Sequence, residues 1–259
     1  MANTTLFGTI RSEWLKFRSV RSSITGAIIT LALTLGINAL VAFAIRSHWP
    51  HVHDRHQAFD PSSFATVGVF FAQFAFGVIG ALFITSEYSS GSIRTSLTAV
   101  PNRAKLIMSK VTVLLKSGLV LAELAVFGGF AVTMSIFHGK VPTASLSDSA
   151  VLRSVILAGV YLTLLALLGF GLGLILRQTA ICISVFVSLL LILPIVSIFF
   201  PTSWKNDLTR FEPSELGNAM MSRFPQPNHF SAYGSAFVLF LYVVVVIGVG
   251  LTMFQRRDA

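Results

Sequence analysis

Six long apolar stretches, separated by short polar segments, set the pattern of this chain. Each is long enough to cross a bilayer as a helix, which takes about 20 apolar residues. None alternates apolar and polar residues with a period of two, and lipid offers no partner for open backbone groups, so only helices fit. We predict an all-α integral membrane protein, a single transmembrane domain over residues 1–259. Its six predicted spans are residues 24–45, 64–86, 117–137, 152–176, 179–200 and 231–254.

An amphipathic helix is predicted before the first span, within residues 1–22. Its apolar residues recur at helical spacing: Leu6, Phe7, Ile10, Trp14 and Phe17. The basic residues Lys16 and Arg18 fall largely elsewhere on the helix. Such a helix lies in the membrane interface, with Trp14 at headgroup depth and its cations toward anionic lipid. The simpler alternative is a basic flank without a defined helix.

The polar segment after the second predicted span, residues 87–105, has an apolar stripe of its own. Ile93, Leu97 and Val100 fall at i, i+4 and i+7, which is the spacing of one helical face. Pro101 ends the helix, because proline cannot continue it. A short amphipathic helix of this kind is suited to a groove on another protein. The alternative is that the stripe lies flat on the membrane.

Between the later spans the sequence predicts a hairpin, a kink and short helices. Residues 177–179 form a very short turn, so the fourth and fifth spans pair as a tight antiparallel hairpin. Gly169, Gly171 and Gly173 favour close helix packing over dinucleotide binding, because no strand precedes them. Pro194 is expected to kink the fifth span. Residues 201–230 are amphipathic and proline-punctuated, which indicates short helices at the outer interface.

Composition and charge agree with a membrane location. Hydrophobic residues make up 54% of the chain and charged residues only 11%, whereas about a quarter of a soluble domain is charged. The net charge of +9 does not indicate nucleic-acid binding, because the Lys and Arg flank apolar stretches and form no basic domain. With the N-terminus inside, most of the 19 Lys and Arg fall on inner segments, which places both termini in the cytoplasm. The one cysteine, Cys182, excludes an intrachain disulfide.

Few residues in the spans offer chemistry, and no catalytic, cofactor or metal site is predicted. Glu123 is the ionisable exception; burying it in lipid costs about 3 kcal/mol, so it suggests a substrate or gating role unless it pairs with Lys116. Gln73 and Asn38 complete a possible intramembrane polar site, although interhelical hydrogen bonds are their simpler explanation. Four histidines crowd one outer segment: His48, His51, His53 and His56. Their spacing matches no closed metal site, so a solvated loop is preferred to zinc or copper binding. No Walker A motif occurs.

Four segments carry a family resemblance. Residues 12–19 read Ser-Glu-Trp-Leu-Lys-Phe-Arg-Ser, and residues 87–103 read Glu-x-x-x-Gly-Ser-Ile-Arg up to a Pro-x-Arg close. Residues 172–180 and 212–219 match in the same order. Together they resemble the permease subunit of type-2 ABC exporters, especially the short actinobacterial kind, over most of the chain. Ser92 stands where threonine is more usual in that family.

The resemblance implies an ATPase-coupling helix between spans two and three, facing the cytoplasm. It would enter a groove of a separate ABC ATPase, with Glu87 at the membrane end and Ile93 and Leu97 as its buried face. The implied coupling residues are Glu87, Gly91, Ile93, Arg94, Leu97, Val100, Pro101 and Arg103. ATP and magnesium would bind the ATPase, and this chain would have no ATPase site of its own.

The expected function is therefore that of the membrane-spanning subunit of an ATP-driven exporter in the bacterial cytoplasmic membrane. Two permease chains, identical or different, would form the path for an amphiphile, drug, peptide or lipid-like substrate. The alternatives are a secondary transporter driven by an ion gradient, a membrane-embedded enzyme using the outer histidine-rich loop, and an accessory protein that only anchors a partner.

Overall fold

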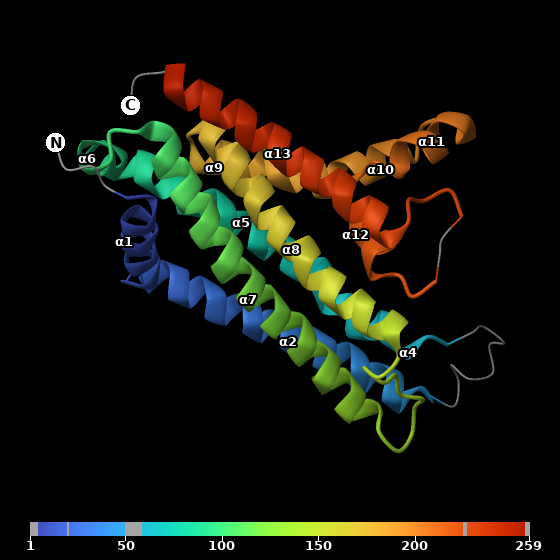
Figure 1. The fold of residues 1–259 in the computed structure, drawn as a ribbon. Coiled ribbons are helices and arrows are strands. Elements are labelled where there is room, and N and C mark those ends of the chain that lie inside the picture. Colours follow the sequence, from blue (N-terminus) through green and yellow to red (C-terminus); the bar gives the residue numbers. More distant parts are fainter. Residues whose placement is uncertain (1–4, 20, 50–58, 225–226, 257–259) are drawn as a thin grey trace.

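The computed structural model describes residues 5–19, 21–49, 59–224 and 227–256, which form a helical bundle without strands (Figure 1). Six of its helices are long and apolar enough to cross a membrane, which confirms the predicted number of spans and the all-helical class. They are Thr25–Ser47, Pro61–Ser89, Arg103–Phe137, Ser149–Leu176, Thr179–Ser197 and Ala232–Arg256.

The elements follow one another as long crossings and short connecting helices. Five crossings are built on α2 (Arg21–Ser47), α5 (Val67–Ser89), α7 (Arg103–Phe137), α8 (Ser149–Leu176) and α13 (Ala232–Arg256). The remaining crossing has three pieces, α9 (Thr179–Val187), the π-helical η1 (Ser188–Ile192) and α10 (Leu193–Ser197). The short helices are α1 (Leu6–Ser19), α4 (Pro61–Ala65), α6 (Ser92–Ala99), α11 (Thr202–Thr209) and α12 (Pro213–Met221).

Helix α8 is the centre of the bundle. In its most apolar stretch 83% of the residues are buried, compared with 22% in α2 and in α13, and α5, α7 and α13 pack around it. The contact with α5 is made backbone to backbone: a Cβ added at Gly80 would overlap the carbonyl of Ala166, and one at Gly169 would overlap the carbonyl of Gly77. The expected packing role of the glycines before the hairpin is confirmed at Gly169 and Gly173.

The third crossing differs from the sequence expectation. The span was predicted over residues 117–137, whereas α7 begins at Arg103 and is longer by several turns. The Asn102 side chain caps the helix by accepting a hydrogen bond from the Lys105 backbone N–H at 3.0 Å. The helix then continues because Leu106, Lys110 and Val113 all lie on a buried face.

The fifth crossing is irregular next to the proline that was expected to kink it. The π-helical turn η1 ends immediately before α10, which contains Pro194. Proline has no N–H for the carbonyl four residues earlier, which belongs to Leu190. The Ser214 hydroxyl of α12 donates to that carbonyl at 3.0 Å instead. The Leu190 carbonyl, which Pro194 leaves without an N–H, is therefore hydrogen-bonded by a neighbouring helix.

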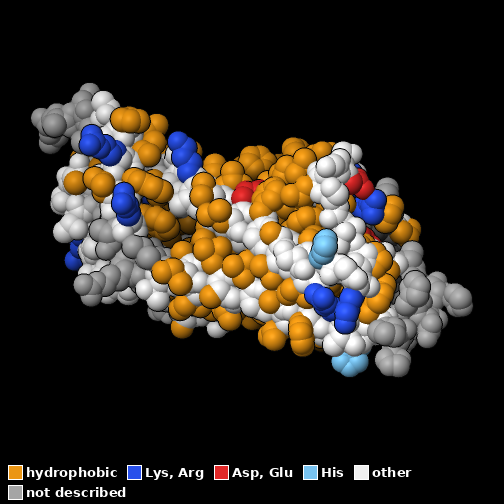
Figure 2. All heavy atoms as spheres, turned by 90° about the horizontal axis from the view of Figure 1, so that it is seen from below, with side chains coloured by type: hydrophobic (Ala, Val, Ile, Leu, Met, Phe, Trp, Pro, Cys, Tyr) orange, Lys and Arg blue, Asp and Glu red, His pale blue; other side chains and the backbone are white. Residues whose placement is uncertain are grey.

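The two ends of the bundle carry different parts. Helices α1 and α6 and both described chain ends lie at one end, and α4 lies at the other (Figure 1). In the view from below, hydrophobic side chains cover the length between the ends, whereas Lys and Arg gather toward them (Figure 2). Two short helices, α11 and α12, form within residues 201–230 as predicted. Of the four crowded histidines, His51, His53 and His56 lie outside the described residues.

Candidate functional site

Helix α6 is held in a defined position at one end of the bundle. Gly91, at its N-terminus, has φ +71°, a left-handed conformation that glycine adopts without strain. The helix ends at Ala99, just before Pro101, as the sequence predicts. Ile93 and Val100 are only 3% and 7% exposed and belong to the chain's own core.

The prediction that the apolar stripe of α6 faces another protein is therefore wrong. Ile93 and Val100 are buried, and Leu97 is partly buried against the same core. An apolar stripe buries itself on the nearest apolar surface, and the chain supplies that surface itself. The exposed residues of α6 lie on its opposite side: Arg94, Thr95, Thr98 and Ala99.

Four charged side chains meet beneath α6 and form what we call the ion cluster: Glu13, Lys16, Glu87 and Lys110. Lys110 Nζ of α7 lies 2.6 Å from Glu13 Oε2 of α1 and 2.7 Å from Glu87 Oε1 of α5. Lys16 of α1 also pairs with Glu87 and reaches Ser96 Oγ of α6 at 3.3 Å. The cluster thus joins α1 to three consecutive helices that come much later in the sequence, α5, α6 and α7.

The ion cluster is buried and balanced. The Lys110 side chain is 0% exposed, the two carboxylates are each 7% exposed, and Lys16 is the one that reaches solvent, at 37%. Two positive and two negative charges cancel. Buried charges are tolerated only when they are paired in this way, and removing one partner costs about 3–5 kcal/mol. The relative position of α1, α5 and α7 is therefore specified by this pairing.

A second contact, which we call the aromatic cluster, lies at the same end: Tyr88, Arg103, Arg177 and Phe254. The Arg177 guanidinium lies 5.3 Å from the centre of the Tyr88 ring, and the Tyr88 and Phe254 rings meet edge to face at 6.5 Å. Arg103 Nη1 donates to the Phe254 carbonyl at 2.8 Å, at the C-terminus of α13, where a cation is favoured. The residues that flank α6 on either side, Tyr88 and Arg103, are thus held by the ends of α8 and α13.

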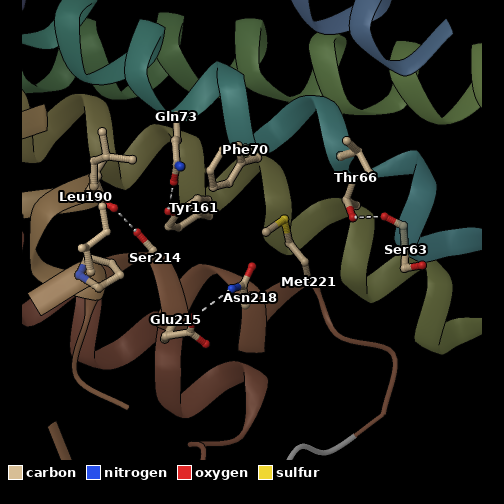
Figure 3. A pocket seen from close by; sticks show the side chains of 14 residues that line it. Ser63, Thr66, Phe70, Gln73, Tyr161, Leu190, Ser214, Glu215, Asn218 and Met221 are labelled. Atoms are coloured by element: carbon tan, nitrogen blue, oxygen red, sulfur yellow. Dashed lines mark hydrogen bonds between the residues drawn. The ribbon is translucent and has the colours of Figure 1, made fainter. Parts of the chain in front are cut away.

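A cavity of about 400 Å³ lies toward the other end of the bundle, between α4–α5, α8, η1–α10 and α12 (Figure 3). Tyr161 Oη donates to Gln73 Oε1 at 2.6 Å, and the Gln73 amide nitrogen has no partner among the described residues. Glu215 faces the same space; it lies 3.3 Å from Asn218 Nδ2 and 3.3 Å from His229 Nε2. Phe70, Pro194 and other apolar side chains complete the walls.

The other predicted polar residues of the spans occupy separate places. Asn38 accepts a hydrogen bond from the Gly68 N–H at 3.0 Å, joining α2 to α5, so the interhelical bond expected for it is confirmed. The bond from Tyr161 confirms the same expectation for Gln73. Glu123 forms no ion pair with Lys116; its carboxylate packs against Gly159 of α8. Asn38, Gln73 and Glu123 therefore do not share one site.

Residues of the N-terminal helix divide between the ion cluster and the surface. Lys16 belongs to the cluster, whereas Trp14 and Arg18 are exposed. The helix exists as predicted, and its place in a membrane interface stays a prediction. Glu13 and Lys110 were not recognised as site residues. The signal that could have found them is an acidic residue beside the apolar face of α1 and a lysine on the buried face of α7.

Two carboxylates outside the spans have shifted pKa values. Burial raises the pKa of Glu212, which is only 3% exposed before α12. The Asp148 carboxylate accepts a hydrogen bond from the Ala150 backbone N–H in the first turn of α8, which lowers the pKa of Asp148. Arg223, whose Nη2 lies 2.5 Å from Asp148 Oδ2, lowers this pKa further. Among the described residues, no group of His, Cys, Asp and Glu is arranged to hold a metal ion.

Most of the chain matches a known protein family. The family described as ABC-2 family transporter protein matches residues 9–205, which include α6 and all of the ion cluster. A search of the curated proteins found no match.

Proposed function

The chain belongs to the ABC-2 family of transporter proteins, and from this premise we propose that α6 couples it to a separate ATPase subunit. As a member of that family the chain is a membrane-spanning permease of an ABC transporter. The energy of transport then comes from ATP bound to the ATPase subunit. A rigid contact between the two proteins must transmit the movement of the ATPase to the membrane crossings.

The observation that supports this proposal is that α6 is packed against the rest of the chain on one side and exposed on the other. Its inner side is anchored by Ile93 and Val100, while Arg94 and Thr98 remain exposed on one outer face. Lys16 ties it to the ion cluster, through which α1, α5 and α7 are joined. A helix mounted in this way moves with the crossings it is attached to. An ATPase bound to the exposed face of α6 would therefore move α1, α5 and α7 together.

The same proposal assigns the transport path. Two permease chains would face each other in the membrane, with their α6 helices on the cytoplasmic side. The cavity around Gln73 and Glu215 would then lie toward the outer side and offer polar contacts within apolar walls. A substrate with a polar group and an apolar body, such as an amphiphile, suits those walls, and export follows from the family.

The test is co-purification of the tagged chain with an ATPase from the native membrane. We expect a partner carrying Walker motifs, identified by mass spectrometry, and ATP hydrolysis in the eluate. Arg94→Glu with Thr98→Arg changes only the exposed face of α6 and should reduce the bound ATPase at least tenfold. Lys140→Glu alters an exposed residue just after α7, a helix that runs from α6 to the opposite end of the bundle (Figure 1), and serves as the matched control.

Two results would contradict the proposal. One is full recovery of the ATPase with the α6 double variant. The other is transport by reconstituted chain that runs on an ion gradient without ATP, which would favour a secondary transporter. Labelling of α6 residues from the external side of intact cells would overturn the assigned orientation.

A further inference from the structure

A groove of about 560 Å³ separates α1 from α7 at the end of the bundle that carries α6. Its walls are largely apolar, with Phe7 and Trp14 from α1 and Val120 and Leu124 from α7. These four side chains are exposed in the chain as it stands, at 77%, 43%, 62% and 60%. Val120 and Leu124 belong to a helix that is apolar enough to cross a membrane, so hydrocarbon is the surrounding that this surface fits.

Two cations line the same groove, and no acidic residue does. Arg11 of α1 and Lys116 of α7 are exposed and make no hydrogen bond or ion pair within the described part of the chain. This distinguishes them from Lys16 and Lys110 nearby, which are both engaged in the ion cluster. The charge of the groove is therefore uncompensated, and an occupant with a negative group would balance it.

The cation and the apolar surface are arranged in line along α7. Lys116, Val120 and Leu124 stand at i, i+4 and i+8 and share one helical face. At 1.5 Å per residue this face extends about 12 Å beyond the lysine. The hydrocarbon of one leaflet is about 15 Å deep, half of the bilayer core. A lysine at the head of such a stripe reaches toward the interface with its ammonium group while its stem covers apolar surface.

We propose that this groove binds one anionic phospholipid from the leaflet on the α6 side. Its phosphate lies between Arg11 and Lys116, and an acyl chain follows Val120 and Leu124 past Trp14. A zwitterionic lipid fits less well, because its headgroup brings a positive charge to two cations. A protein segment fits less well too, since the groove opens where the chain is surrounded by lipid. This site is independent of the ATPase and of the exported substrate.

Tryptophan quenching tests the proposal, because Trp14 lines the groove. Trp49→Phe and Trp204→Phe leave Trp14 as the sole tryptophan of the chain, which has three. The protein is reconstituted in phosphatidylcholine bilayers that contain a small, equal fraction of brominated phosphatidylglycerol or brominated phosphatidylcholine. We expect markedly stronger quenching by the anionic lipid. Arg11→Gln and Lys116→Gln should each lower its preferential binding about fivefold, since one basic residue near the surface contributes about that factor.

Charge-preserving variants separate the loss of a site from the loss of folding. Arg11→Lys with Lys116→Arg should keep the preference for brominated phosphatidylglycerol, and Lys140→Gln at the other end of the bundle should leave it unchanged. Equal quenching by the two brominated lipids would overturn the proposal and assign the groove to bulk lipid. An unchanged preference in the Arg11→Gln, Lys116→Gln double variant would overturn it as well.

Discussion

Replacing Lys110 with methionine tests the ion cluster directly. The substitution keeps the length of the side chain and removes its charge from a position that is 0% exposed. Glu13 and Glu87 are left together in the protein interior with only the half-exposed Lys16 beside them. Leaving a buried charge without its partner costs about 3–5 kcal/mol. With about 2–4 °C per kcal/mol for a chain of this size, the unfolding temperature should fall by about 6–20 °C.

The assay uses the one cysteine of the chain. Cys182 is buried in the bundle, so a thiol-reactive fluorogenic dye reports thermal unfolding of the detergent-solubilised protein. Lys116→Met, an exposed lysine on the same helix, is the matched control and should change the midpoint little. Lys110→Met combined with Glu13→Gln restores one positive to one negative charge and should recover at least half of the loss.

Either of two results would refute the reasoning. A Lys110→Met midpoint within about 2 °C of the wild type would mean that the cluster does not hold the helices together. A double variant no more stable than Lys110→Met would mean that charge balance is not the cause of the loss.

Three further predictions concern packing, pH and the cavity beside Gln73. Gly80→Val should strongly lower the unfolding temperature, because its Cβ overlaps the Ala166 carbonyl, whereas Gly36→Ala, with nothing within 4 Å, should match or exceed the wild type. Glu212→Gln should raise the unfolding temperature at pH 8 but not at pH 4. Burial raises the pKa of Glu212 in the folded chain, so the folded chain binds more protons than the unfolded one and wild-type stability falls as pH rises. An equal gain in unfolding temperature at both pH values would contradict this. Gln73→Leu should cost about 1–3 kcal/mol by leaving the buried Tyr161 hydroxyl unpaired, and adding Tyr161→Phe should recover most of it in the same thermal assay.

The sequence was sufficient for most features that depend on local pattern. Six apolar stretches predicted six crossings, and helical spacing before the first and after the second predicted α1 and α6. The two-residue turn after α8 and the glycines before it were also anticipated. These features follow from hydrophobic periodicity and turn chemistry, which neighbouring residues determine among themselves.

Features that join distant segments were not predictable in the same way. Glu13 and Lys110 are 97 positions apart, and nothing local marks them as partners. The stripe of α6 was assigned to a foreign groove because spacing shows that a face is apolar but not what covers it. The start of α7 was missed for a similar reason: the predicted span began at residue 117, after the last lysine, whereas Lys110 is neutralised inside the bundle.

Helix α5 runs without interruption from the cavity to α6, and its backbone contacts the backbone of α8 at two places along the way. Gln73 and Glu87 are 14 residues apart on it, which is about 21 Å of stiff rod. Because the backbones of the two helices touch at Gly80 and Gly169, they would tilt together, and a tilt of about three degrees over that length shifts the far end by about 1 Å. Displacements of that size are the ones by which packed helices switch states. The glycine contacts therefore make α5 and α8 a stiff pair, along which a small displacement beside α6 would reach the cavity with little loss.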